Sequence, residues 1–278
     1  MAKAHRRAKL QRYRRSLRLF WSTALAAELE YQANALVELV AVLGNLAGSL
    51  FVLSLLYGHG RDLGGWSWDA ALVVLGLYTL LDGFTSCLLQ PNLSKIVGHV
   101  QNGTLDFVLL KPIDSQLWLS ARQISPWGLP GVLAGLGLIV WGLTQAGPTA
   151  AWSDPGAGLR NLGLGLTLLF CAAAILYSLW FLLAGLSIWF VKVWNATEVL
   201  RTTLVAGRYP VSAYPPALRL LFTFVLPVAF LTTVPAEALL GRASGLWVAG
   251  SLLAAGLSLA LSRAFWRRAL RHYTSASS

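Results

Sequence analysis

The stretch LSKIVGHVQNGTLDFVLLKP, residues 93–112, is a polar interruption between two long apolar runs, and it carries a helical pattern of its own. Apolar residues recur in its first half at positions i, i+3, i+4 and i+7: Leu93, Ile96, Val97 and Val100. This spacing predicts a short helix with one apolar stripe. A helix of about ten residues cannot cross a bilayer, which takes about 20 residues, so we expect it to lie on the membrane surface or to be held by another protein.

Polar residues mark the ends and the opposite face of this helix. Lys95 and His99 point away from the stripe. Asn92 is a residue type that often caps a helix N-terminus, and Gly103 stands where helices often end in the left-handed conformation. We therefore predict that the helix begins after Asn92 and ends before Gly103.

The composition indicates a membrane protein. Of 278 residues, 56% are hydrophobic and 12% are charged, whereas soluble domains carry roughly 25% charged residues. The 12 Trp, 26 Gly and 11 Pro suit membrane interfaces and packed transmembrane helices. Cys87 and Cys171 both lie inside apolar segments, where small packing residues are expected rather than a disulfide or a metal pair.

The N-terminus is strongly basic. Residues 1–18 contain eight Lys or Arg and no acid, so we expect this end to stay in the cytoplasm. Leu17, Phe20, Trp21 and Ala24 then recur at helical spacing, which predicts an amphipathic helix in the inner interface before the first span. The alternative is a disordered basic tail held by anionic lipid.

Hydropathy predicts an all-α integral membrane protein with six transmembrane helices. The third helix should be bent by Pro126 and Pro130, and the fifth has two interpretations. Either it covers residues 218–234, or it is a short span at 197–206 followed by a Pro-rich segment at 209–240 that dips into the outer leaflet without crossing. The other expected spans are residues 35–57, 70–90, 117–143, 162–190 and 246–261.

The distribution of Lys and Arg supports cytoplasmic termini. With the short fifth span, 17 of the 22 Lys and Arg lie inside. The five outside are Arg61, Arg160, Arg208, Arg219 and Arg242. This topology also places residues 93–112 in the cytoplasm, where ATP and soluble partners are.

Several kinds of chemistry have no signature in the chain. It lacks GxxxxGK[ST], so it has no phosphate-cradling loop and cannot be its own motor by that route. Its four His are widely separated, and HExxH, CxxC and GxSxG do not occur, so no catalytic residue and no metal site is predicted. Scattered basic residues without an aromatic platform also argue against nucleic-acid binding.

Ionisable residues inside the spans cost several kcal/mol unless they are paired or face water. Asp82 lies roughly 13 Å from the inner end of the second span, at 1.5 Å per residue. It either lines a polar pathway or pairs with a polar neighbour such as Asn45, and replacing it by Asn should impair transport while sparing assembly. Glu38 is interpreted as an interfacial carboxylate, and Glu198 and Arg201 as a pair on one helix face.

Two GxxxG motifs allow helices to approach closely. Gly44 and Gly48 form one in the first span, and Gly131 and Gly135 form the other in the third. For the third span, packing inside the chain is the expected use.

Two segments and the six-span plan resemble the membrane subunits of ABC-2 type transporters, the permeases of ATP-binding-cassette exporters, and in particular a bacterial branch of that family. The first segment is GTLDFVLLKP at Gly103–Pro112, which looks like the loop signature of that branch. The second is the Pro-punctuated GRYPVSAYPPALRLLFTFVLPVAFLTTVPAEALLG at residues 207–241.

The resemblance implies an architecture. Residues 1–33 would be a basic tail and an elbow helix, 34–265 the six-span domain with a coupling loop at 91–114 and a gate region at 207–242, and 266–278 a basic cytoplasmic tail. The loop helix would couple to a separate ATPase, its stripe seated against the ATPase groove or against the spans. The residues expected to serve the coupling are Leu93, Lys95, Ile96, Val97, His99, Val100, Gly103, Leu105 and Asp106.

The resemblance also implies the partners. We expect two copies of an ABC ATPase, which would hold ATP and magnesium, together with a second permease, identical or related, in the bacterial inner membrane, surrounded by lipid. Gly44 and Gly48 would lie at the permease dimer interface. Asn45 and Asp82, polar residues inside the spans, are the candidates for the pathway. The alternatives are an ion-coupled secondary transporter that uses Asp82 and a membrane scaffold that transports nothing.

Overall fold

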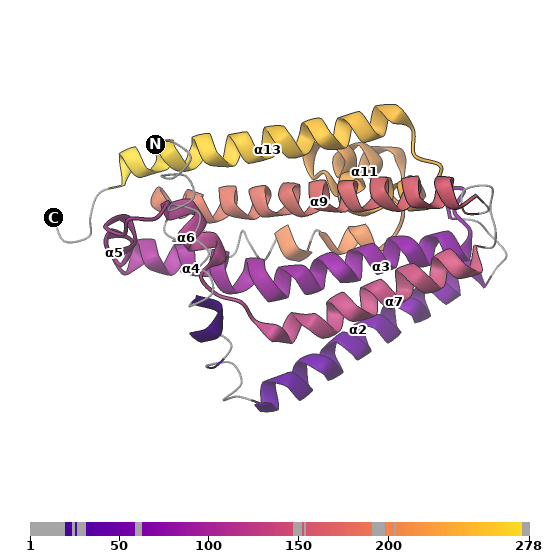
Figure 1. The fold of residues 1–278 in the computed structure, drawn as a ribbon, viewed down its shortest axis with the longest axis horizontal. Coiled ribbons are helices and arrows are strands. Elements are labelled where there is room, and N and C mark those ends of the chain that lie inside the picture. The colour runs from indigo at the N-terminus through magenta and orange to yellow at the C-terminus, as the bar shows by residue number, and fades with distance from the viewer. Residues whose placement is uncertain are drawn as a thin grey trace.

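The computed structural model describes residues 20–23, 26, 32–58, 63–146, 152, 154–190, 198, 200–202 and 204–273. In that part of the chain every regular element is a helix, which confirms the predicted class. Long helices lie side by side, and α4, α5 and α6 gather at one end of the molecule (Figure 1), which we call the α5 end. The helices long and apolar enough to cross a membrane are Leu36–Tyr57, Trp68–Gln101, Pro126–Gln145, Pro155–Ile188 and Gly245–His272. A sixth crossing results if the bent pair Pro216–Val225 and Ala229–Leu239 is one span.

The second span and the predicted loop helix form one continuous helix. Helix α3 (Trp68–Phe84) passes through the π-helical turn η1 (Thr85–Leu89) into α4 (Gln90–Gln101). Its 34 residues measure about 50 Å, whereas the hydrocarbon core is about 30 Å thick, so α4 extends beyond the core. The prediction that Asn92 caps a separate helix is therefore wrong, because Asn92 lies inside the helix and its side chain is buried.

Glycines bring α3 against α7 (Leu129–Gln145). A Cβ at Gly135 would lie 2.4 Å from the backbone nitrogen of Leu80 and 2.6 Å from the carbonyl oxygen of Gly76. A Cβ at Gly83 would lie 2.5 Å from the backbone nitrogen of Val132. The two backbones are thus in direct contact, as small residues allow, and the expected internal packing of this glycine motif is confirmed.

The predicted third span is divided in two. Helix α6 (Ser115–Ala121) belongs to the α5 end, and the spanning part starts with the 3₁₀ turn η2 (Pro126–Gly128) before α7. The break follows from Pro126, because the residue before a proline is driven out of the helical conformation. Ser125 is indeed extended, with φ −107° and ψ 120°.

Helices α9 (Pro155–Gly185) and α13 (Gly245–His272) pack together along their length (Figure 1). Phe181 and Trp266 meet edge to face, with ring centroids 5.3 Å apart, and both side chains are fully buried. The sixth span, expected at 246–261, continues as helix to His272. Arginine is a good helix former, and cations near a helix C-terminus are favoured by its dipole, so the basic residues extend the helix rather than end it.

The Pro-rich segment after α9 contains the bent pair. Helix α11 (Pro216–Leu220) with η6 (Leu221–Val225) meets η7 (Ala229–Thr233) with α12 (Val234–Leu239) at 76°. A fifth span at 218–234 would therefore be broken in its middle, because Leu226, the residue before Pro227, is extended, and this interpretation stays a prediction. The short span at 197–206 and the re-entrant gate stay predictions.

The C-terminal half of helix α2 (Gln32–Tyr57) packs against the bundle, where Leu53 is fully buried, and α2 also contacts η2. Toward its N-terminus it diverges from α3 and α7 (Figure 1). The apolar side chains of this diverging half are exposed: Leu36, Val37, Leu39, Val40 and Leu43.

Candidate functional site

A polar crevice lies where α2 diverges from the α3–η1–α4 helix. It consists of two adjoining cavities of about 190 and 420 Å³. Both are lined by Glu38 of α2, Ser86 of η1, Gly128 of η2 and Arg201. The deep cavity reaches toward the middle of the spans and is also lined by Asn45, Ser49, Tyr78, Thr79 and Asp82. The mouth cavity lies toward the α5 end and is also lined by Gln90, Ser94, Lys95, Gln123 and Ser125.

An ion pair stands between the two cavities. Arg201 Nη2 lies 3.7 Å from Asp82 Oδ1, and each side chain keeps about a third of its surface exposed, 33% and 30%. Arg201 Nη1 also donates a hydrogen bond of 3.2 Å to Gln90 Oε1. Within the described residues Asp82 is the ionic partner of Arg201, so the expected pair of Glu198 with Arg201 is wrong. Asp82 faces the crevice, and a role in a transport pathway stays a prediction.

A second arginine, Arg208, contacts two residues that line the deep cavity, Asn45 and Tyr78. Arg208 Nη2 donates a hydrogen bond of 2.6 Å to Asn45 Oδ1, and its guanidinium lies 5.1 Å from the ring centroid of Tyr78. Asn45 and Tyr78 stand near the middle of their helices, so Arg208 lies beside the middle of the spans and not on the outer side, where the charge count placed it. Asn45 is thus held by Arg208 and does not pair with Asp82.

The mouth of the crevice is held by amide hydrogen bonds. Asn92 Oδ1 accepts from the backbone N–H of Gln123 at 2.8 Å, and Asn92 Nδ2 donates to the Gln123 carbonyl at 2.7 Å. Lys95 Nζ donates to Gln123 Oε1 at 2.5 Å. The π-helical turn beside it leaves the Cys87 carbonyl free to accept from the Ser125 N–H at 2.9 Å. Such π-helical turns are frequent at functional sites.

The predicted apolar stripe is packed inside the chain. Leu93 and Ile96 are fully buried and Val97 is 4% exposed. Leu93 and Ile96 belong to one core cluster with residues of α6, α9 and α13, and Val100 packs against it. Of the two predicted seats for the stripe, the spans of the same chain are therefore the correct one, and the stripe is not an open surface for a partner.

The remaining predicted coupling residues have different environments. Gly103 is left-handed as predicted, with φ 66°, and lets the chain turn into α5 (Leu105–Leu109). His99 Nδ1 and Thr104 Oγ1 are 2.8 Å apart across this turn. Leu105 is fully buried, and Asp106 is half-buried. The role of these residues in coupling stays a prediction.

An exposed apolar ridge lies on α5 and the residue after it. Phe107 is 68% exposed, Leu110 is 81% exposed, and Leu109 also faces outward. Lys111 follows them and is exposed. We call Phe107, Leu109 and Leu110 the tip ridge. Because α5 stands at the end of the molecule (Figure 1), beyond the length that the hydrocarbon core covers, lipid tails do not account for this exposure.

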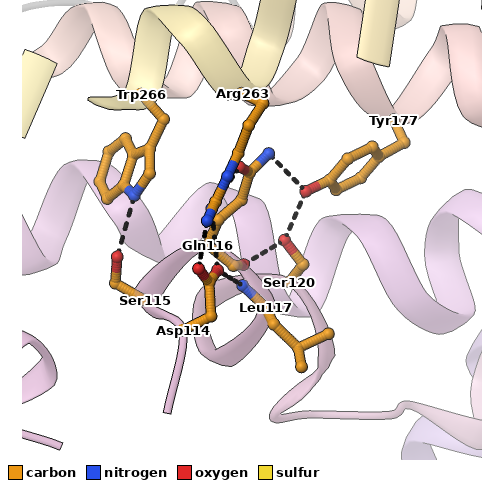
Figure 2. Close-up of polar contacts among 8 residues, drawn as sticks. All are labelled: Asp114, Ser115, Gln116, Leu117, Ser120, Tyr177, Arg263 and Trp266. Atoms are coloured by element: carbon orange, nitrogen blue, oxygen red, sulfur yellow. Dashed lines mark hydrogen bonds and ion pairs between the residues drawn. The ribbon is translucent and has the colours of Figure 1, made fainter. Parts of the chain in front are cut away.

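A polar cluster fastens α6 to the long helices (Figure 2). Arg263 of α13 forms an ion pair with Asp114, and its Nη1 donates 2.9 Å and 3.1 Å hydrogen bonds to Asp114 Oδ1 and Gln116 Oε1. Tyr177 Oη of α9 lies 3.1 Å from Gln116 Nε2 and 2.9 Å from Ser120 Oγ. We call these residues, together with the hydrogen bond from Trp266 Nε1 to Ser115 Oγ, the α6 latch.

Asp114 has two tasks in the latch. It caps α6, accepting a hydrogen bond of 3.1 Å from the Leu117 N–H, and it pairs with Arg263. Burial raises the pKa of Asp114, but the hydrogen bonds from Arg263 and Leu117 lower it more, so the pKa lies below its ordinary value of 3.8. The carboxylate is therefore charged at neutral pH.

The polar side chains of the crevice suit the binding of a ligand, and the α6 latch suits the transmission of movement between helices. Across the described ranges, no group of three His, Cys, Asp or Glu is placed to hold a metal ion. The charged residues of the crevice are instead spread along its length, as in ion or substrate pathways through membranes.

Sequence reasoning found Asp82 and Asn45 but missed Arg201 as a partner, Arg208, the tip ridge and the α6 latch. Arg201 is 111 residues from Gln90, and Arg263 is 149 from Asp114, so no local pattern joins them. The signal that could have found the ridge is the run FVLL at residues 107–110. A short helix has a single buried face, and only part of such an apolar run fits it.

Comparison with known protein families gives one match over most of the chain. A family model described as ABC-2 family transporter protein matches residues 43–277. No curated protein gives a significant match. The matched residues include most of α2, the whole crevice wall on α3 and α4, the tip ridge, the latch and α13. The chain therefore belongs to the ABC-2 family of transporter proteins and is a multi-pass membrane protein with a permease role.

Proposed function

We propose that this chain is the permease of an ABC exporter in the bacterial inner membrane, and that a separate ATPase subunit engages its α5 end from the cytoplasm. The tip ridge carries this proposal, because exposed apolar side chains beyond the membrane mark a protein contact. Family membership supports an ABC ATPase as the partner. Lys111 beside the ridge adds a cation to the contact.

The mechanical route from the ridge has two branches. Helix α5 leads directly into α4, which is continuous with α3, so a push on the ridge moves one wall of the crevice. Helix α6 is fastened by the latch to α9 and α13, so the same push is passed to the other spans. The stripe of α4 acts as the rigid core between these branches, and Gly103 permits the turn.

The complete transporter would hold two permeases and two ATPases. ATP and magnesium would bind to the ATPase, since this chain lacks the phosphate-binding motif. The permeases would pair through α2, where a Cβ at Gly44 or Gly48 would meet nothing within 4 Å. This open glycine face is where a second copy could approach closely.

A double substitution of the ridge tests the proposal. Affinity-tagged chain is purified from native membranes, and a co-purifying subunit is identified by its GxxxxGK[ST] motif and ATP hydrolysis. Phe107→Glu with Leu110→Glu should reduce its recovery at least tenfold, because two charges replace the apolar contact. Leu246→Glu is the matched control, since Leu246 is also 81% exposed but lies at the start of α13, at the opposite end. Equal recovery with the ridge variant and the control would contradict the proposed contact.

A further inference from the structure

The polar crevice carries fixed charges of both signs on facing walls. Glu38 stands on α2 and Asp82 on α3, while Lys95 stands on α4 and Arg201 on the segment after α9. Arg201 is only loosely paired, since 3.7 Å to Asp82 is longer than a hydrogen bond and a third of its side chain is open. In the part of the chain that the structure describes, Glu38 makes no ion pair. The crevice therefore offers both anionic and cationic contacts.

The α2 wall beside these charges is partly apolar. Ala41, Val42 and Leu46 line the deep cavity, and outside it Leu39 and Leu43 of the same half of α2 are 43% and 54% exposed. In Figure 1 this half of α2 points away from α3 and α7. A molecule bound in the deep cavity beside α2 meets apolar side chains and charged groups at once.

We propose that the polar crevice binds a zwitterionic amphiphile, with its phosphate at Arg201 and Lys95, its ammonium at Glu38 and Asp82, and its apolar tail along the exposed half of α2. This inference rests on the proposed permease function and names its substrate class. The two cavities, of about 190 and 420 Å³, are of the size that holds a lipid headgroup.

Charge balance selects a zwitterion over simpler ligands. A lone anion at Arg201 and Lys95 lies close to the two carboxylates, and a lone cation at the carboxylates lies close to the two bases; each is repelled by the groups it does not need. An uncharged ligand displaces water from the four charged side chains without replacing the hydrogen bonds that this water made, which costs free energy. A ligand with both charges satisfies both pairs.

Equilibrium binding to the full chain in a nonionic maltoside micelle, without ATP, tests the inference. The probes share one chain length: lysophosphatidylethanolamine, lysophosphatidic acid and a primary alkylamine; glycerophosphoethanolamine is the headgroup without a tail. Lysophosphatidylethanolamine should bind at least tenfold more tightly than each of the other three. If lysophosphatidic acid or the amine binds as tightly as lysophosphatidylethanolamine, the claim that the ligand needs both charges is wrong. If the headgroup without a tail binds as tightly, the claim that the ligand needs an apolar tail is wrong.

Variants place the ligand in the crevice. Glu38→Gln and Lys95→Gln should each weaken the binding of lysophosphatidylethanolamine about tenfold. Their melting temperatures should not differ from those of the control variants. Arg160→Gln and Asp154→Asn are charge-matched controls on exposed residues at the α9 start, and they should bind as the unmodified chain does. Unchanged binding by both crevice variants would overturn the site. The assay uses no ATPase, so failure to find an ATPase partner leaves its result unaffected, and loss of this result leaves ATPase coupling testable.

Discussion

At the scale of single residues, Asp114 joins the loop between the second and third spans to α13. Asp114→Asn keeps a side-chain acceptor for the Leu117 N–H, because asparagine caps helices as well as aspartate does, and removes the charge that pairs with Arg263. Both side chains are about a third exposed, so solvent screens the pair and we expect the free energy of unfolding to fall by only about 1 kcal/mol. Chemical denaturation in detergent measures this difference.

Asp154→Asn is the control for that substitution. Asp154 caps α9 in the same way, accepting from the Ala157 N–H at 3.0 Å, and among the described residues it makes no ion pair. Its replacement should change stability by a few tenths of a kcal/mol. A loss as large as that of Asp114→Asn would show that capping, and not the pair with Arg263, supplies the stabilisation.

The pH dependence of the α6 latch has a definite sign. Because the folded-state pKa of Asp114 lies below its ordinary value of 3.8, the pair contributes its full stability above that value. As pH falls through the ordinary value toward the lower folded-state pKa, the contribution is lost. The difference in unfolding free energy between the unmodified chain and Asp114→Asn should therefore be constant from pH 5 to pH 7, which lies about one to three pH units above the ordinary pKa of 3.8. Below about pH 4 the difference should shrink. A difference that grows on acidification would contradict the pair.

The sequence predicted the residues of the crevice only where composition alone singles them out. An acid and an amide inside apolar runs are conspicuous, which is why Asp82 and Asn45 were found. Their partners Arg201 and Arg208 were read as topology signals, since a basic residue near a span end is normally one. The contact of Arg208 with Asn45 joins residues 163 positions apart and depends on how the Pro-rich segment folds back.

At the scale of elements, glycines bring the backbones of α3 and α7 into direct contact. Gly135→Val places a Cβ 2.4 Å from the Leu80 nitrogen, so the two helices must move apart, and we expect a loss of about 2–3 kcal/mol or more. Gly137→Val is the matched control, because it lies on the same helix and a Cβ there meets nothing within 4 Å. Thermal unfolding of both variants in detergent measures the effect, and similar melting temperatures would contradict the contact.

Helical periodicity located α4 correctly but not its environment. The stripe Leu93, Ile96, Val97 and Val100 is apolar because it is core, and a buried face and a docking face have the same spacing in sequence. The continuity of α3 with α4 was also missed, since Asn92 is a residue type that often caps a helix N-terminus. Pro91 is tolerated there because the π-helical turn before it has already shifted the backbone hydrogen bonds.

At the scale of the whole molecule, α2 is the natural place for a second permease. Large parts of α2 are exposed, including its glycine face, whereas α3 is largely buried. Gly44→Leu with Gly48→Leu should convert the proposed dimer to a monomer in size-exclusion chromatography with light scattering, because the added side chains prevent close approach. Gly163→Leu is a control on α9 where a Cβ also meets nothing within 4 Å. A dimer that survives the double change would place the interface elsewhere.

We propose that a separate ATPase drives this permease. The most direct test is the subunit content and ATP hydrolysis of the complex purified with this chain from native membranes. We expect a co-purifying ABC ATPase in equal copy number, with hydrolysis that requires magnesium and is lowered when Phe107 and Leu110 are replaced by Glu. A chain that never carries an ATPase, and whose transport follows a proton or sodium gradient instead, would contradict this mechanism and make Asp82 the residue of interest.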